Sequence, residues 1–185
     1  FSVGLLITAD PSVGKSELAL ELLARGHRLV ADDAPIFAKT APEILSGRCP
    51  DILRDILEVR GLGILNIRAM FGDSAIKQAR NLRLILKLVP MTEDQMHSID
   101  RLHGARTTQT ILGIEIPEIT LPVAPGRNLA VLAEAAARNH TLLVKGFGSA
   151  QLFMAREAPV VEIGGEPVST GIVEGRAGGG RGGQG

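Results

Sequence analysis

The chain has 185 residues, 45% of them hydrophobic and 22% charged, which suits one globular domain with a sizeable core. Its 20 basic and 20 acidic side chains cancel, so we expect neither a broad nucleic-acid-binding surface nor a membrane-binding surface. The single cysteine, Cys49, excludes an internal disulfide, and neither a signal peptide nor a bilayer-spanning apolar run is recognisable, so we expect a cytoplasmic location.

The first predicted elements surround the most informative stretch of the chain. The apolar run at 2–8 predicts a buried strand, and residues 15–25 predict a helix with apolar side chains at i,i+4 spacing that ends at Gly26. The loop between them reads Ala-Asp-Pro-Ser-Val-Gly-Lys-Ser, and this strand–loop–helix order is typical of a phosphate-binding loop.

A phosphate-binding loop presents backbone N–H groups and a helix start to phosphate, while its lysine reaches the β and γ oxygens and its hydroxyl binds Mg²⁺. The candidate phosphate-binding residues are Ala9, Asp10, Pro11, Ser12, Val13, Gly14, Lys15 and Ser16. Ala9 replaces the usual leading glycine, at a cost of roughly 1 kcal/mol. Pro11 lacks an N–H, and Ser12 stands where a third glycine is common. The alternative is an exposed Lys-Ser pair in which Ser16 helps to cap the helix.

Shorter elements follow in the rest of the chain. In chain order we expect a strand at 27–33, a strand at 36–39, a turn-rich stretch at 42–50, a short helix at 51–57 beside Pro50, and a glycine-interrupted loop and strand at 58–72. After these come a strand at 82–89, a polar irregular stretch at 91–110, strands at 111–116 and 119–123 broken at Pro117 and Pro122, and helices at 129–139 and 149–156. The glycine-rich end, 175–185, predicts a mobile tail.

Two adjacent acids, Asp32 and Asp33, end the strand expected at 27–33. In open α/β sheets, ligands bind at the carboxyl ends of strands. One acid there can hold Mg²⁺ or its water, and the other can take a proton from an attacking hydroxyl, but the spacing does not assign the two roles. The alternative is an Asp pair that only initiates a turn.

Further charged residues could contact phosphate or metal. Arg60 suits bidentate phosphate binding between glycine-rich turns, and Glu58 offers an oxygen ligand to Mg²⁺, although the two could also form a surface pair. Arg127 precedes Asn128, a suitable helix N-cap, and so lies beside a helix start where anions collect. Arg101, judged by spacing alone, is a solvated side chain. The remaining candidates, expected to be structural or surface residues because they lack metal-ligand spacing, are His27, His97, His103, His140 and Cys49.

Taken together, these stretches resemble the catalytic domain of the bacterial HPr kinase/phosphorylase family. That family phosphorylates a serine of HPr, a phosphocarrier protein of the sugar phosphotransferase system, and removes the phosphate by phosphorolysis. The matching stretches are 14–22, 25–33, 57–66 and 126–131, and the likeness runs from about residue 2 to 156. The family also uses a histidine a few residues ahead of the first strand, and because Phe1 is not Met we expect the natural start to lie upstream.

The resemblance implies a fold and a set of roles. The fold is α/β, a P-loop kinase core similar to the phosphoenolpyruvate carboxykinases, with a mixed central sheet flanked by helices over residues 1–157 and an unmatched, disordered tail at 158–185. Residues 9–16, with Arg60 and Arg127, would hold the phosphates of ATP or pyrophosphate. Lys15, Asp33 and Arg101 would be catalytic, with Asp33 moving the proton. The Mg²⁺ ligands would be Ser16 and Glu58, to which the position of Asp32 adds a third.

The resemblance also implies that residues 57–66 serve both reactions and residues 122–127 mainly dephosphorylation, and that HPr is the partner of a ring-like hexamer. Two alternatives remain open at this point. The altered phosphate loop could belong to a catalytically impaired nucleotide-binding relative, or the same core could phosphorylate a small molecule.

Overall fold

The computed structural model describes residues 3–98 and 106–148. A mixed six-stranded sheet lies at its centre, in the order β2-β3-β6-β8-β7, with β1 also paired to β6. The strands of this sheet are β1 (Gly4–Ala9), β2 (Ile36–Ala41), β3 (Ile44–Arg48), β6 (Ala79–Pro90), β7 (Arg106–Ile111) and β8 (Ile114–Val123). A separate hairpin pairs β4 (Ile56–Val59) with β5 (Gly63–Asn66). The helices are α1 (Lys15–Ala24), α2 (Ile67–Phe71), α3 (Glu93–His97) and α4 (Leu129–Val144). The expected α/β class, with a mixed sheet flanked by helices, is confirmed.

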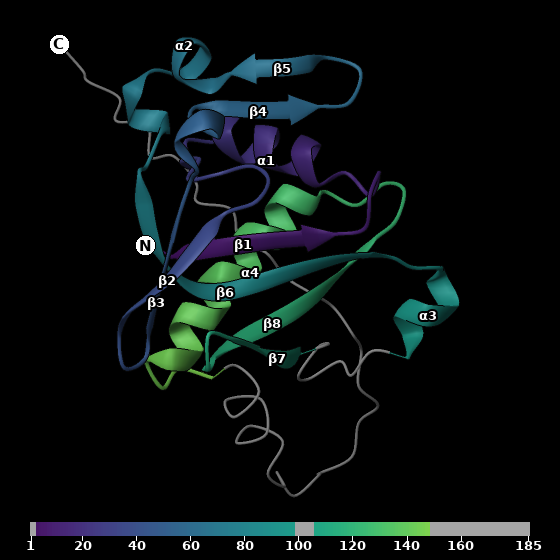
Figure 1. Ribbon diagram of the computed structural model, residues 1–185. Coiled ribbons are helices and arrows are strands. Elements are labelled where there is room, and N and C mark those ends of the chain that lie inside the picture. Colours follow the sequence, from purple (N-terminus) through teal and green to yellow (C-terminus); the bar gives the residue numbers. More distant parts are fainter. Residues whose placement is uncertain (1–2, 99–105, 149–185) are drawn as a thin grey trace, which may run out of the picture.

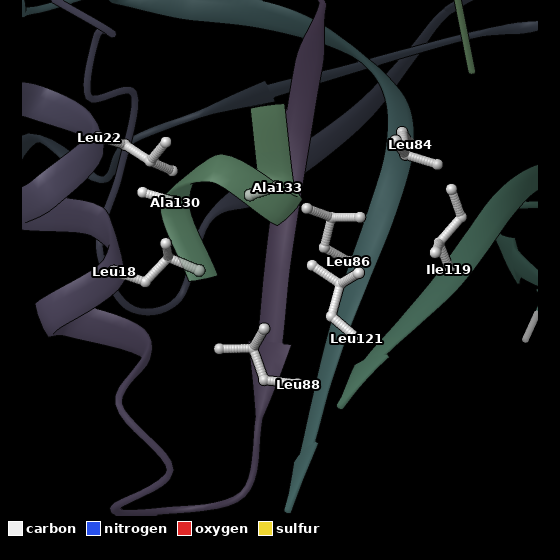
Figure 2. Close-up of a cluster of buried hydrophobic side chains, with 9 residues drawn as sticks. All are labelled: Leu18, Leu22, Leu84, Leu86, Leu88, Ile119, Leu121, Ala130 and Ala133. Carbon is white, nitrogen blue, oxygen red and sulfur yellow. The ribbon is translucent and has the colours of Figure 1, made fainter. Parts of the chain in front are cut away.

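The main hydrophobic core joins the sheet to α1 and α4 (Figure 2). Alternate residues of β6 and β8 supply one side of this core, and the two helices supply the other. Its buried members are Leu18, Leu22, Leu84, Leu86, Leu88, Ile119, Leu121, Ala130 and Ala133. Ile85 points to a second cluster on the other face of the sheet, with Leu45 and Ile116. Residues 84–86 are therefore buried on both faces of the sheet, which is typical of a central strand.

The direction of the strands brings two turns to one edge of the sheet. Because β1 and β8 both run parallel to β6, their carboxyl ends lie together, with Ala9 beside Leu88 and Val123 beside Pro90. The turn after β1 leads into α1, and the turn after β8 leads into α4. Figure 1 shows the β4–β5 hairpin across α1 from the large sheet, and Leu23 of α1 is buried there with Leu57 and Val59 of β4.

The middle of the chain differs from the expected elements. Residues 27–33 form no strand, and only Leu29 makes an isolated bridge, with Ile76, because its side chain packs into the cluster beneath β4 instead of into the sheet. The stretch 42–50 holds β3, since Leu45 is buried against the sheet. The helix expected at 51–57 shrinks to a 3-10 turn at Asp51–Leu53, because residues from Ile56 onward pair in the hairpin. The strands expected at 36–39 and 82–89 are confirmed as β2 and β6.

The later part of the chain differs in similar ways. The stretch 91–110 contains α3, begun by a capping box at Thr92, and β7, which pairs with β8. The strand β8 continues through both prolines. Pro117 pairs only with β7 and Pro122 only with β6, so each proline lies where one side of β8 has no partner strand within the described residues. The expected helix at 129–139 continues to Val144.

Some expectations fall outside the part of the chain that the structure describes. They are Arg101, His103, the helix at 149–156 and the tail at 158–185. Within the described ranges, the helices are too short or too polar to span a lipid bilayer.

Candidate functional site

The loop between β1 and α1 turns on two residues with positive φ. Gly14 caps α1 at φ 103° and ψ 24°, a left-handed conformation that glycine adopts without a Cβ penalty, and its carbonyl accepts from Leu18 N at 3.0 Å. Ser12 also has a positive φ, of 73°, where the common glycine would be unstrained. Ala9, in contrast, is the last residue of β1 and has no positive φ. The expected backbone cost at Ala9 is therefore wrong, and Ser12 carries the cost of the altered loop.

Lys15 lies at the centre of the site. Its Nζ donates to Oδ1 of Asp33 at 2.6 Å and to Oδ1 of Asp32 at 3.4 Å. Burial lowers the pKa of Lys15, but the hydrogen bond to Asp33 and the charges of both carboxylates outweigh it, so its pKa lies above the ordinary 10.5. The first turn of α1 thus holds a fully protonated ammonium group beside two acids.

The two acids differ in their surroundings. The side chain of Asp32 is 10% exposed, and its Oδ2 accepts from the backbone N–H of Glu58 at 2.9 Å. The side chain of Asp33 is 71% exposed. Asp32 is consequently anchored between Lys15 and β4, whereas Asp33 faces solvent from the same cluster.

The β4–β5 hairpin is tied to the loop by Arg60. Its guanidinium donates to Ser12 Oγ at 2.7 Å, and the chain turns at Gly61 and Gly63, with φ of 87° and 83°. The structure thus brings Arg60 into contact with the loop, whereas its roles and those of Glu58 in binding phosphate and metal stay predictions. Glu58 reaches Asp32 through its backbone N–H.

The proposed metal ligands do not form a preformed metal-binding site among the described residues. Among residues 3–98 and 106–148, no group of three or more His, Cys, Asp or Glu side chains could hold a metal ion. Ser16, in the first turn of α1, and the Asp32 carboxylate beside Lys15 are hard oxygen donors. Mg²⁺ often takes one or two such protein ligands and completes its shell with phosphate oxygens and water. This donor set fits Mg²⁺ that arrives with a nucleotide.

Arg127 lines a cleft next to the loop. The cleft measures about 420 Å³ and is bounded by Gly14, two turns of α1 and the turn that starts α4. Arg127 donates to Met96 Sδ at 2.9 Å, so the structure places its side chain in this cleft and on α3, apart from the contacts of Lys15. The expected cap of α4 is confirmed, because Asn128 Oδ1 accepts from Val131 N at 3.0 Å.

A second cavity lies beneath the acids. It measures about 570 Å³ and is bounded by β1, α1, α4 and the segment 26–32. Lys15 and Asp32 are part of its wall, as is Glu134 of α4. The sequence analysis missed Glu134, because its partners Arg25 and His27 are more than 100 residues away in the chain and only helix packing brings them together.

Three of the residues expected to be structural or surface residues are found in buried or surface positions. His140 is buried, and burial, aided by the charge of Arg106, lowers its pKa. Cys49 is also buried, which raises the pKa of its thiol. His27 is half-exposed and donates to Glu134.

Comparisons with known proteins point to one family. The family model described as "HPr Serine kinase C-terminal domain" matches residues 1–157. HPr kinase/phosphorylases of Stenotrophomonas maltophilia (strain K279a) and Xylella fastidiosa (strain M12) are each 57% identical over 163 residues, covering 88% of this chain and 52% of the relative. The chain therefore spans about half the length of the curated relatives it matches.

A solved structure is also similar. The Hpr(Ser) kinase/phosphatase from Coxiella burnetii superimposes with a TM-score of 0.70 at 36% identity, and the match covers 82% of this chain and 90% of that one. The family resemblance read from the sequence is confirmed by both kinds of comparison.

Proposed function

The chain belongs to the HPr serine kinase C-terminal domain family, and from this premise we propose that it transfers a phosphoryl group from ATP to a serine of HPr and removes it by phosphorolysis. One observation carries the proposal most directly. Lys15, at the start of a helix behind a glycine-containing loop, contacts two adjacent carboxylates, one anchored and one open to solvent. Phosphoryl transfer to a hydroxyl needs such a cation for phosphate and such a base for the proton.

Each residue has a role in this mechanism. Residues 9–16 cradle the phosphates, and the Lys15 ammonium offsets the charge of the transferred group. Asp33 accepts the serine proton in the forward reaction and returns it to the serine oxygen when phosphate is the attacking group. Arg60 stabilises the loop through Ser12, and Arg127 contributes a positive charge from the adjacent cleft. Arg101, by resemblance to the family, offsets charge in the transition state.

Mg²⁺ would be held by Ser16, Asp32 and Glu58 together with phosphate oxygens, and when bound it neutralises charge on those oxygens. The anchoring of Asp32 by Glu58 N–H fixes one carboxylate next to Lys15 before any nucleotide arrives. The arrangement therefore separates an anchored acid, suited to metal, from a solvent-exposed acid, suited to proton transfer.

The partner and assembly are proposed from the family as well. HPr supplies the serine, either ATP or pyrophosphate supplies the phosphoryl group, and the protein works as a ring-like hexamer in the cytoplasm. Both alternatives, an impaired relative and a small-molecule kinase, are disfavoured by the relatives, which are named HPr kinase/phosphorylases.

Phosphopeptide mass spectrometry tests the proposal. The purified protein is incubated with HPr, ATP and Mg²⁺, and we expect one phosphoserine to form on HPr and to disappear when inorganic phosphate is added in excess. Absence of phosphoserine, with nucleotide binding intact by calorimetry, would support the impaired relative instead. Transfer to a metabolite but not to HPr would support the small-molecule kinase.

A further inference from the structure

Glu134 of α4 holds both residues that flank the turn at the end of α1. Its carboxylate accepts from Arg25 Nε at 3.0 Å, from Arg25 Nη2 at 2.7 Å and from His27 Nε2 at 2.8 Å. Between these partners lies Gly26, with a φ of 89°, where the chain leaves the helix. One carboxylate therefore bridges the two residues on either side of Gly26, at the point where the chain turns toward Asp32 and Asp33.

The contact between Arg25 and Glu134 has a well-defined geometry. A bidentate arginine–carboxylate pair is directional, and the side chain of Glu134 is only 17% exposed. The hydrogen bond from Arg25, with that from His27, lowers the pKa of Glu134 from 4.5 to about 2. Glu134 is consequently ionised throughout the neutral range.

The segment that follows also has backbone supports, the first of which is the bond from His27 N to Leu22 O at 3.0 Å. Residues 27–33 form neither helix nor strand. Leu29 donates to Ala75 O and accepts from Lys77 N, both at 2.8 Å, and Asp32 accepts from Glu58 N. Below the segment lies the 570 Å³ cavity, whose wall includes Glu134. Packing of Leu29 beneath β4 holds the middle of the segment, whereas its two ends are held by hydrogen bonds.

We propose that Glu134 is a positioning residue for phosphoryl transfer: through His27 and Arg25 it fixes the start of segment 27–33 and so places Asp32 and Asp33 beside Lys15. The inference rests on the proposed function for its effect on turnover, but not for its effect on the segment. Among the residues that the structure describes, Glu134 hydrogen-bonds to Arg25 and His27 and not to the Lys15 cluster, so it acts through the backbone between them.

Four variants separate positioning from simple stabilisation. They are Glu134→Ala, Glu134→Gln, His27→Ala and the double variant Glu134→Ala/His27→Ala, with Glu115→Gln on the exposed surface of β8 as the matched control. We expect Glu134→Ala to lower kcat for HPr phosphorylation by about tenfold or more, with KM for ATP within about twofold. Glu134→Gln keeps an acceptor oxygen and should recover part of kcat. The double variant should be no worse than Glu134→Ala, since both residues act through one contact.

Hydrogen exchange gives a readout that needs no activity. Amides of residues 27–33 should exchange faster in Glu134→Ala than in the wild-type protein, while the control is unchanged. If wild-type protein transfers nothing to HPr, the proposed function fails, and exchange still decides whether Glu134 holds the segment. The inference is overturned by unchanged exchange at 27–33, by unchanged kcat in folded Glu134→Ala, or by a double variant whose losses multiply.

Discussion

The ammonium nitrogen of Lys15 lies 2.6 Å from a carboxylate oxygen of Asp33, although the two residues are 18 positions apart, one in α1 and the other in the loop before β2. Phosphate that enters the loop competes with Asp33 for this ammonium. The proposed mechanism therefore requires the pair to separate, so that Lys15 faces phosphate while Asp33 faces the serine hydroxyl.

Replacing Asp33 tests its role as the base. We expect Asp33→Asn to lower kcat by about 100- to 10,000-fold, because the amide cannot accept the serine proton. Stability should change by less than about 1 kcal/mol, since the Asp33 side chain is 71% exposed. Steady-state phosphorylation and thermal unfolding measure the two effects. Glu43→Gln, in the exposed turn before β3, is the matched loss of a carboxylate, and full activity in Asp33→Asn contradicts the assignment.

The Glu134 contact predicts a defined acid dependence of stability. The folded pKa of Glu134, about 2, lies below its ordinary 4.5, so the contact contributes fully above pH 4.5 and is lost as pH falls toward 2. The free energy of unfolding should therefore fall more steeply between pH 4.5 and 2 in the wild-type protein than in Glu134→Gln. Urea titrations at several pH values measure this difference. If the free energy of unfolding depends on pH in the same way in both proteins, the Glu134 contact is not the source of the acid dependence.

The backbone around the loop predicts a loss of stability when glycine and alanine are exchanged in either direction, at Gly14 and at Ala9. Gly14→Ala should destabilise the protein by roughly 1–2 kcal/mol, because a Cβ at φ 103° is strained even though its nearest neighbour is 3.9 Å away. Ala9→Gly restores the usual leading glycine, but Ala9 lies in a strand, so stability should fall by about 0.5–1 kcal/mol. Chemical denaturation compares both with the wild-type protein. A gain in stability for Ala9→Gly would contradict the extended strand conformation of residue 9 as the preferred one.

The packing of β6 predicts a large effect in the core. Leu86 is completely buried between the sheet and the two flanking helices, so Leu86→Ala should lower the free energy of unfolding by about 2–5 kcal/mol. Val144→Ala, at a side chain that is 74% exposed, should change it by less than about 0.5 kcal/mol. Denaturant unfolding measures both variants. A lower midpoint for Leu86→Ala at an unchanged slope would support the prediction, and equal losses of unfolding free energy in the two variants would contradict it.

Much of the fold was predictable because its signals are local. Apolar spacing in 15–25 and 129–139 marks the buried stripes of α1 and α4, and glycine in Gly14-Lys15-Ser16 marks the turn between strand and helix. Strand boundaries were less predictable. Leu29 belongs to an apolar run that looks like a strand, but it is buried beneath the hairpin, and β8 continues through Pro117 because only one of its sides is paired there.

The amino-acid sequence by itself determined the strand–loop–helix order around Gly14 and the two helices α1 and α4, and it supplied the acids and arginines proposed to act with that loop, because these features follow from residue type and short spacing. Only the tertiary structure decided that Asp32 is anchored by Glu58 N–H, that Ser12 and not Ala9 bears the strain, and that Glu134 holds Arg25 and His27. The reason is physical: apolar periodicity shows which face of a helix is buried, but not which polar side chain, more than 100 residues away, the packing brings beside it.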